Sequence, residues 1–203
     1  MKMKYFAALI ASSLLTAGAH ATPIFEDDFD SEGTAGQSAL NYNEFTNWTV
    51  SDGTVDLIYN TNHWGISCLG GTGKCVDLDG STGNAGTLTS TMFTLAAGNY
   101  SLVFDISGNQ RNGSNDMMQV ILNGILGGET FDLAGSAPWQ TVTRNFTVTE
   151  LTNSYVSFAH DGGDNIGIML DNVAVKAVPE PGTLALLSLG LLGLGAAYRR
   201  RSV

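Results

Sequence analysis

Residues 99–106, Asn-Tyr-Ser-Leu-Val-Phe-Asp-Ile, carry a large apolar side chain at every second position. Successive side chains of a β-strand point to opposite faces of its sheet, so this spacing places Tyr100, Leu102, Phe104 and Ile106 on one face. The stretch therefore predicts a β-strand with one face buried in a core.

Similar short stretches lie on both sides of it, separated by clusters of Gly, Asn, Asp and Ser. Expected strands cover residues 24–29, 48–59 with a turn at Asp52-Gly53, 75–78, 87–95, 118–122, 142–148, 154–159 and 168–175. Further turns are expected at residues 97–99 and at Asn123-Gly124. No stretch between residues 22 and 177 predicts a convincing helix. About nine strands are enough for two packed sheets, and the pattern indicates an all-β sandwich or barrel.

The first 21 residues have the three parts of a secretion signal. Lys2 and Lys4 give a positive start, residues 5–17 are uncharged and mostly apolar, and Ala19-His20-Ala21 offers the small residues that a signal peptidase reads. We expect cleavage after Ala21. The alternative, a membrane helix that is retained, is disfavoured because the apolar run falls short of the roughly 20 residues that a span needs.

The C-terminal residues 178–203 show a second three-part order. Val178-Pro179-Glu180-Pro181 comes first, an apolar run follows over residues 183–198, and Arg199-Arg200-Arg201 closes it. The prolines end the preceding strand. The apolar run predicts a short transmembrane helix, with the arginines on the cytoplasmic side. An amphipathic core helix is the alternative, but the leucines of this run cover all sides of a helix and leave no polar face.

Pro-Glu-Pro, an apolar helix and a terminal Arg cluster, in this order, resemble the PEP-CTERM sorting signal of Gram-negative bacteria. The resemblance implies that an exosortase removes the tail, after a signal peptidase has acted at the other end. It also implies export to the cell envelope, the cell surface or an extracellular matrix of exopolysaccharide, with the C-terminal helix in the membrane before processing. The tail predicts where the protein is delivered and says nothing about its activity.

Residues 22–177 are expected to form one domain with a sizeable core. This segment holds 18 acidic and four basic residues, a net charge of −14. Nucleic acid is therefore excluded as a partner, because phosphates need Lys and Arg to displace counterions. Where carboxylates converge, such a charge favours divalent cations.

Cys68 and Cys75 enclose a Gly-rich loop. Export places them in an oxidising compartment, so we expect a disulfide that staples a surface loop. A metal pair is the alternative, but no further ligand of the right type lies nearby in the sequence.

Several motifs in a fixed order resemble the jelly-roll domains of carbohydrate-binding modules and galactose-binding-like proteins. They are Asp28-Phe29-Asp30, Trp48 with residues 53–57, residues 76–80, residues 95–104, Trp139 before Phe146, and residues 167–173. The resemblance implies a two-sheet jelly-roll β-sandwich over most of residues 22–177.

In the domains that it resembles, a structural calcium ion often ties the first strand to the last. Asp30 and Asp171 match the positions of its acidic ligands, and Glu26, Asp27 or Asp28 can substitute for Asp30. Calcium takes six to eight oxygen ligands, some of them backbone carbonyls. The alternative is that Asp171 caps a turn and that the acidic cluster at residues 26–30 is solvated.

A sugar site needs exposed aromatic rings beside polar side chains. Residues 59–65, Tyr-Asn-Thr-Asn-His-Trp-Gly, have this composition, and residues 109–112 follow an expected strand. The candidate ligand-binding residues are Tyr59, His63, Trp64, Asn109 and Arg111. Tyr59 and Trp64 can equally belong to the core, and the core is the favoured place for Trp48 and Trp139.

Enzyme signatures are missing from residues 22–177. His160 precedes Asp161, but neighbours on a strand do not face each other, and there is no nucleophile elbow. No phosphate-binding loop follows Gly70-Gly71 or Gly127-Gly128. We therefore expect an exported, non-catalytic β-sandwich that binds polysaccharide. The alternatives are a purely structural surface or biofilm protein and, with less support, a small glycan-active enzyme.

Overall fold

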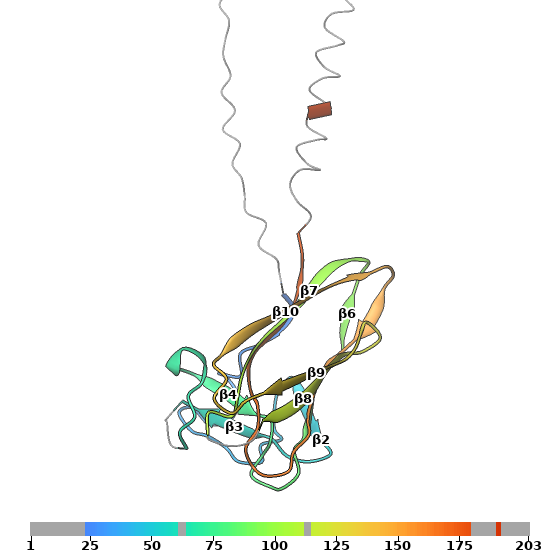
Figure 1. Cartoon of the computed structure of the whole chain (residues 1–203). Helices are drawn as coiled ribbons and strands as arrows, with labels where there is room; N and C mark the ends of the chain where they lie inside the picture. Colours follow the sequence, from blue (N-terminus) through green and yellow to red (C-terminus); the bar gives the residue numbers. More distant parts are fainter. Residues whose placement is uncertain (1–22, 61–63, 112–114, 180–189, 192–203) are drawn as a thin grey trace, which may run out of the picture.

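The computed structural model describes residues 23–60, 64–111, 115–179 and 190–191. In these residues the chain forms thirteen β-strands and one 3-10 turn, η1 (Leu69–Gly71). The strands run from Pro23 to Ala177 and build two main sheets that face each other (Figure 1). This is the two-sheet jelly-roll β-sandwich that the sequence predicts. The expected signal peptide and nearly all of the expected transmembrane helix lie outside the described residues, and no described helix is long and apolar enough to cross a membrane.

The strands of the two sheets pair in antiparallel fashion throughout. One sheet has the order β10 (Gln140–Val148), β7 (Gly98–Ser107), β13 (Met169–Ala177), β4 (Lys74–Asp77) and β3 (Asp56–Tyr59), with β1 (Pro23–Asp27) also paired to β13. The other has the order β2 (Trp48–Ser51), β5 (Thr87–Ser90), β12 (Val156–His160), β8 (Asp116–Leu122) and β9 (Leu126–Leu133). A separate pair joins β6 (Phe93–Leu95) to β11 (Thr152–Ser154).

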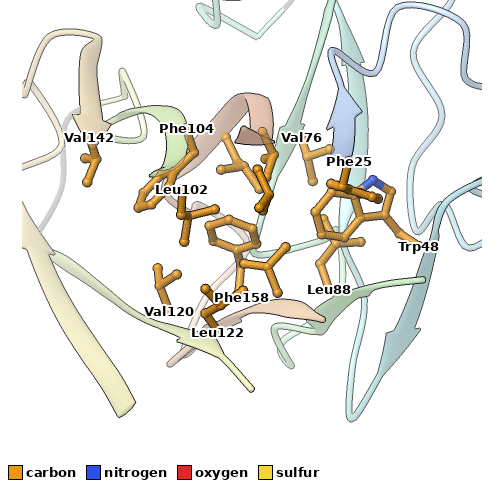
Figure 2. Close-up of a cluster of buried hydrophobic side chains, with 14 of the residues drawn as sticks. Phe25, Trp48, Val76, Leu88, Leu102, Phe104, Val120, Leu122, Val142 and Phe158 are labelled. Atoms are coloured by element: carbon orange, nitrogen blue, oxygen red, sulfur yellow. The ribbon is translucent and has the colours of Figure 1, made fainter. Parts of the chain in front are cut away.

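The main core lies between the two sheets (Figure 2). As the alternation of residues 99–106 predicts, Tyr100, Leu102, Phe104 and Ile106 are all buried in it. The ring of Phe158, from the opposite sheet, meets the ring of Phe104 edge-on at 5.3 Å between centroids. Each such side chain contributes roughly 1.5–3 kcal/mol by leaving water, so the facing rows hold the two sheets together.

A second, smaller cluster covers the outer face of the six-stranded sheet. It contains Ile58, Ile66, Cys68, Cys75 and Met169, with Trp139 packed against it. The expected disulfide is confirmed: Cys68 and Cys75 are joined, with their Cα atoms 5.5 Å apart. The loop between the cysteines is therefore fastened onto this sheet, beside the strand ends that form the candidate site.

Two expected strands are each divided between sheets, which corrects the prediction for residues 48–59 and 87–95. β2 lies in the five-stranded sheet and β3 in the six-stranded sheet, so the turn at Asp52-Gly53 crosses from one layer to the other. Gly53 lies so close to the neighbouring loop that a Cβ atom would stand 2.2 Å from the Ala85 carbonyl oxygen. In the same way β5 and β6 belong to different sheets.

The prediction also missed β9. Its Gly127-Gly128 pair interrupts the apolar spacing, and only Phe131 and Leu133 alternate after it, which is too short a pattern to indicate a strand. The strand is held by its pairing with β8, from Asp116↔Leu133 to Leu122↔Leu126. Cross-strand pairing of this kind has no local sequence signal.

The direction of β13 separates the two ends of the sandwich. Met169, at its start, pairs with Asp77 and Ser107. Ala177, at its end, pairs with Tyr100, and Lys176 pairs with Pro23 of β1. At about 3.3 Å per residue, the strand spans roughly 25–30 Å. The start of the first strand and the end of the last strand therefore lie at one end of the sandwich (Figure 1). The loops around Asp77 lie at the other end.

Candidate ligand-binding site

A pocket of about 230 Å³ opens at the end of the sandwich where β13 begins. We call it the Trp64–Arg111 pocket. It is lined by Leu40, Asp56, Ile58, Trp64, Ile66, Asp77, Ser81, Arg111 and Asn165. One aromatic ring, a few aliphatic groups and several polar groups from six separate segments thus share one hollow.

Arg111 forms the polar wall of the pocket. Its Nη2 donates to Asp77 Oδ2 at 2.6 Å and to the Asn165 carbonyl oxygen at 3.3 Å. The Asp77 side chain is 2% exposed, and its Oδ1 accepts from the backbone amides of Asp79 and Gly167. Burial raises the pKa of Asp77, and the Arg111 charge with these two amides opposes that rise. Arg111 Nε is buried without an acceptor among the described residues.

Trp64 forms the apolar wall and is 45% exposed. The segment that follows it is held by the loop after β7. The side chain of Gln110 accepts from the Ser67 amide at 2.9 Å and donates to the Ser67 carbonyl at 2.9 Å. Trp139 Nε1 donates to the same carbonyl at 3.0 Å. The disulfide at Cys68 and these bonds at Ser67 therefore fix the chain just beyond Trp64.

The floor of the pocket is made by Asp56 and Ser81. Asp56 Oδ1 accepts from the amides of Asn41 and Ser81, and its Oδ2 accepts from the Ser81 hydroxyl at 2.7 Å. These bonds fix the start of β3 against the loop after β4. The pocket is therefore rigidly built on its polar side.

The structure brings two of the five predicted ligand residues together, Trp64 and Arg111. Asn109 is 1% exposed and braces the loop instead: its Nδ2 donates to Asp116 Oδ2 at 2.7 Å and its Oδ1 accepts from the Arg111 amide. Tyr59 is half-buried at the end of β3, pairs with Lys74 across the strands and does not line the pocket. His63 lies outside the described residues.

Sequence reasoning did not find Asp56, Asp77, Ser81 and Asn165. Asp56 and Asp77 are the end residues of β3 and β4 and look like ordinary polar strand residues. Their pairing in register is what turns both toward the same end of the sheet. The available signal was the position of these two residues in the sequence. Each lies where a strand begins or ends, and polar residues at the ends of neighbouring strands gather at one edge of the sheet.

The predicted calcium residues Asp30 and Asp171 also lie near each other, beside the disulfide loop. Asp30 Oδ1 accepts from the Lys74 amide at 2.6 Å, and Asp171 Oδ1 accepts from the Asn172 amide at 2.8 Å. Burial raises the pKa of Asp171 to about 7, the amides of Asn172 and Leu69 oppose the rise, and the charges of Asp30 and Asp105 add to it. Two converging carboxylates are ligands of the type that calcium binds.

Backbone carbonyls and water would have to complete that coordination, because no three acidic, His or Cys side chains of the described residues converge on one metal position. The alternative acidic residue Asp27 is engaged elsewhere, accepting from Trp48 Nε1 at 3.0 Å and from Asn47 Nδ2. Calcium at Asp30 and Asp171 stays a prediction.

The comparison with protein families finds the PEP-CTERM protein-sorting motif over residues 177–201. The chain carries a PEP-CTERM sorting signal. This confirms the resemblance read from Pro179-Glu180-Pro181 and Arg199-Arg200-Arg201, and it marks the protein for export. No curated protein matches the chain in sequence.

Solved structures with a similar fold include carbohydrate-binding modules. A module from lichenase 5A of Cellvibrio mixtus, in complex with cellotriose, is 14% identical with a TM-score of 0.40, covering 78% of this chain and all of that one. A family 35 module from Clostridium thermocellum is 15% identical with a TM-score of 0.44, covering 70% and 98%.

The N-terminal modules of xylanase 10B from Clostridium thermocellum, complexed with xylohexaose, are 14% identical with a TM-score of 0.49. That match covers 78% of this chain and 29% of the xylanase chain, so the protein spans under a third of its length. These similarities concern the fold, and they say nothing about a ligand of this chain.

Proposed function

We propose that the β-sandwich is a non-catalytic carbohydrate-binding domain, and that the Trp64–Arg111 pocket is its binding site. The observation that carries the proposal is a 45% exposed indole that lines a pocket together with a few aliphatic side chains and a polar side fixed by hydrogen bonds. Sugars present apolar C–H faces and hydroxyl groups together, and a site for them combines an aromatic platform with a few placed polar groups.

The hydrogen bonds of the pocket favour a neutral polyol over a charged ligand. The charges of Arg111 and Asp77 compensate each other at 2.6 Å. Asp56 is engaged by Asn41 and Ser81. Arg111 Nε is a buried donor without an acceptor among the described residues, and a ligand hydroxyl would reach it only after the side chain has shifted toward the pocket.

The position of the pocket supports a role at the cell surface. The pocket lies where β13 begins, and the sorting motif starts at residue 177, where β13 ends. A chain held by its C-terminal tail thus presents the pocket at its far end. We propose processing by a signal peptidase and an exosortase, and a final place in the cell envelope, at the cell surface or in an exopolysaccharide matrix of a Gram-negative bacterium.

The proposal is tested by applying the full chain to a glycan array, with calcium and again with a chelator. We expect binding to a defined polysaccharide class, and at least a tenfold loss of affinity in Trp64→Ala, which corresponds to about 1.4 kcal/mol. Leu151→Ala is the matched control, because Leu151 is 76% exposed and lies outside the pocket.

Binding that survives Trp64→Ala unchanged would show that the sugar site lies elsewhere. Silence on the array with an intact fold by circular dichroism, together with a surface or biofilm phenotype on deletion, would favour a purely structural role. Hydrolysis of a glycan by the purified chain would overturn the non-catalytic assignment.

A further inference from the structure

The carboxylate of Asp79 is buried without partners. The residue is 0% exposed, and neither Oδ1 nor Oδ2 has a hydrogen-bond partner among the described residues. It is the second residue after β4, in the loop Leu78-Asp79-Gly80-Ser81. A buried carboxylate that lacks both hydrogen bonds and a counter-charge is strongly unfavourable, so this position calls for a physical explanation.

The loops around Asp79 are packed closely onto it. The backbone of Gly167 comes so near that a Cβ atom there would lie 2.4 Å from the Asp79 amide nitrogen. The Leu78 amide donates to the Ile168 carbonyl at 3.1 Å, which ties the same two segments together. The two segments therefore leave no free space beside the backbone of Asp79 on this side.

The nearest charges to Asp79 are negative. Burial raises the pKa of Asp79 most, and the charges of Asp164, Asp116 and Asp56 add to the rise and bring it to about 6. The backbone amide of Asp164 opposes the rise but makes no hydrogen bond of ordinary geometry with the carboxylate. Arg111, the arginine described at this end of the sandwich, is paired with Asp77 instead.

We propose that Asp79 and Asp164 bind a divalent cation, best matched by calcium, at the loop end of the sandwich. This site is separate from the predicted calcium site at Asp30 and Asp171, and it does not depend on glycan binding. Neither oxygen of Asp79 is engaged in a hydrogen bond among the described residues, so both have lone pairs left for an ion. Asp164 uses Oδ1 to accept from the Ile166 amide, and that bond leaves its Oδ2 for the metal.

Protonation of Asp79 explains the site less well than a cation does. A neutral carboxyl group has one O–H donor and one carbonyl acceptor, and both would remain unpaired where no partner reaches either oxygen. A cation satisfies both oxygens and also offsets the repulsion from Asp164 and Asp116.

The surroundings suit an oxygen-coordinated ion. No three acidic, His or Cys side chains converge on one metal position in the described part of the chain, so backbone carbonyls and water would complete the six to eight oxygens that calcium takes. The loop Asp161-Gly162-Gly163-Asp164 lines a surface hollow of about 280 Å³ together with Asp116. Asp164 and Asp116 line that hollow and Asp79 does not, so an ion that reaches Asp79 must pass from the hollow beneath the loop that carries Asp164.

The test is isothermal titration of the full chain with calcium chloride at pH 7.5, after removal of metals with a chelator. Asp79→Asn is expected to bind one calcium ion fewer than the wild type and to lose the corresponding calcium-induced rise in Tm. Asp52→Asn is the matched control: it removes one exposed charge from a neighbouring turn, and asparagine tolerates its φ of +62°. It should bind as the wild type does.

Asp171→Asn separates the two calcium sites, because it should retain the ion that Asp79→Asn loses. If Asp79→Asn does not fold, Asp164→Asn replaces it, with at least a tenfold weaker affinity at this site expected. The proposal is overturned if the wild type binds no calcium, or if folded Asp79→Asn or Asp164→Asn binds as many ions as tightly as the wild type.

Discussion

Arg111 Nη2 and Asp77 Oδ2 lie 2.6 Å apart and join the loop after β7 to the end of β4 across 34 positions of sequence. The Asp77 side chain is 2% exposed and that of Arg111 is 23% exposed, so the pair is screened from water mainly on the side of the carboxylate. The ion pair is thus both a wall of the pocket and a brace between two strands of the six-stranded sheet.

Replacing Arg111 by methionine leaves Asp77 buried without its counter-charge. Loss of one partner from a buried pair costs about 3–5 kcal/mol, and the partial exposure of Arg111 places the expected loss near the lower end. Arg144→Met is the matched control, since Arg144 and Glu129 also form an ion pair but are 39% and 41% exposed. It should cost about 1 kcal/mol or less. Urea unfolding measures both, and equal losses would contradict the role given to burial.

Opening the disulfide is expected to loosen the pocket as well as the fold. A cross-link that closes eight residues, from Cys68 to Cys75, stabilises by about 2.5 kcal/mol in the chain-entropy model. Ser67 lies beside Cys68 and carries the bonds to Gln110 and Trp139. We therefore expect the Cys68→Ser, Cys75→Ser double variant to have a lower Tm and a weaker glycan affinity.

Mild reduction of the wild type is the companion measurement. It should lower the glycan affinity to that of the double variant, whereas the same treatment of the variant should change nothing. Full retention of affinity in the reduced protein would show that the loop does not position Trp64.

The sequence predicted strands well where one face of the strand is buried in the core. Residues 99–106 meet that condition, and their spacing is visible without knowledge of any partner strand. β9 meets it only in part: Leu126, Phe131 and Leu133 pack against the core but stay half-buried, and Gly127-Gly128 interrupts their spacing. The turn at Asp52-Gly53 was found, but no local feature shows that it changes sheets.

The candidate site was predictable only in part for a related reason. Trp64 and Arg111 are unusual residues in polar, Gly- and Asn-rich segments, and composition alone points to them. Asp77 and Asp79 sit in a motif, Val-Asp-Leu-Asp-Gly, that suggested only a fold. Their roles depend on which loops reach them, and Arg111 and Asp164 come from distant parts of the chain.

The stability of the metal-free protein should depend on pH through Asp171. Its pKa of about 7 lies above the ordinary 3.8, so the folded state holds a proton that the unfolded state releases. The stabilisation from this proton is present below pH 4 and is lost as the pH rises through 7. With a chelator present, Asp171→Asn should therefore be more stable than the wild type at pH 8, by up to about 4 kcal/mol, and should lose this advantage near pH 4.

Urea unfolding of both proteins at pH 4, 6 and 8 measures the difference. A constant difference across this range would contradict the raised pKa. Added calcium is the control for the metal prediction. If the ion binds at Asp30 and Asp171, it favours the charged carboxylate, and the wild type should then be more stable than Asp171→Asn at pH 8.

Gly53 is the position where a single methyl group should most disturb the crossing between the sheets. A Cβ atom there would lie 2.2 Å from the Ala85 carbonyl oxygen and 2.5 Å from that of Asn84, both backbone atoms that cannot rotate away. The neighbouring backbone is also bound, because the Thr54 amide donates to the Asn84 carbonyl at 3.0 Å. Gly53→Ala should therefore cost about 3 kcal/mol or more, at the upper end of the range for overpacking.

Gly83→Ala is the matched control in the facing loop, since nothing lies within 4 Å of its added Cβ and its φ is not in the left-handed region. It should be neutral or stabilise by up to about 1 kcal/mol, through the smaller entropy of the unfolded chain. Thermal unfolding of the two variants under one set of conditions decides the point. Similar Tm values would mean that the loop yields, and that the close approach at Gly53 does not fix how β2 passes into β3.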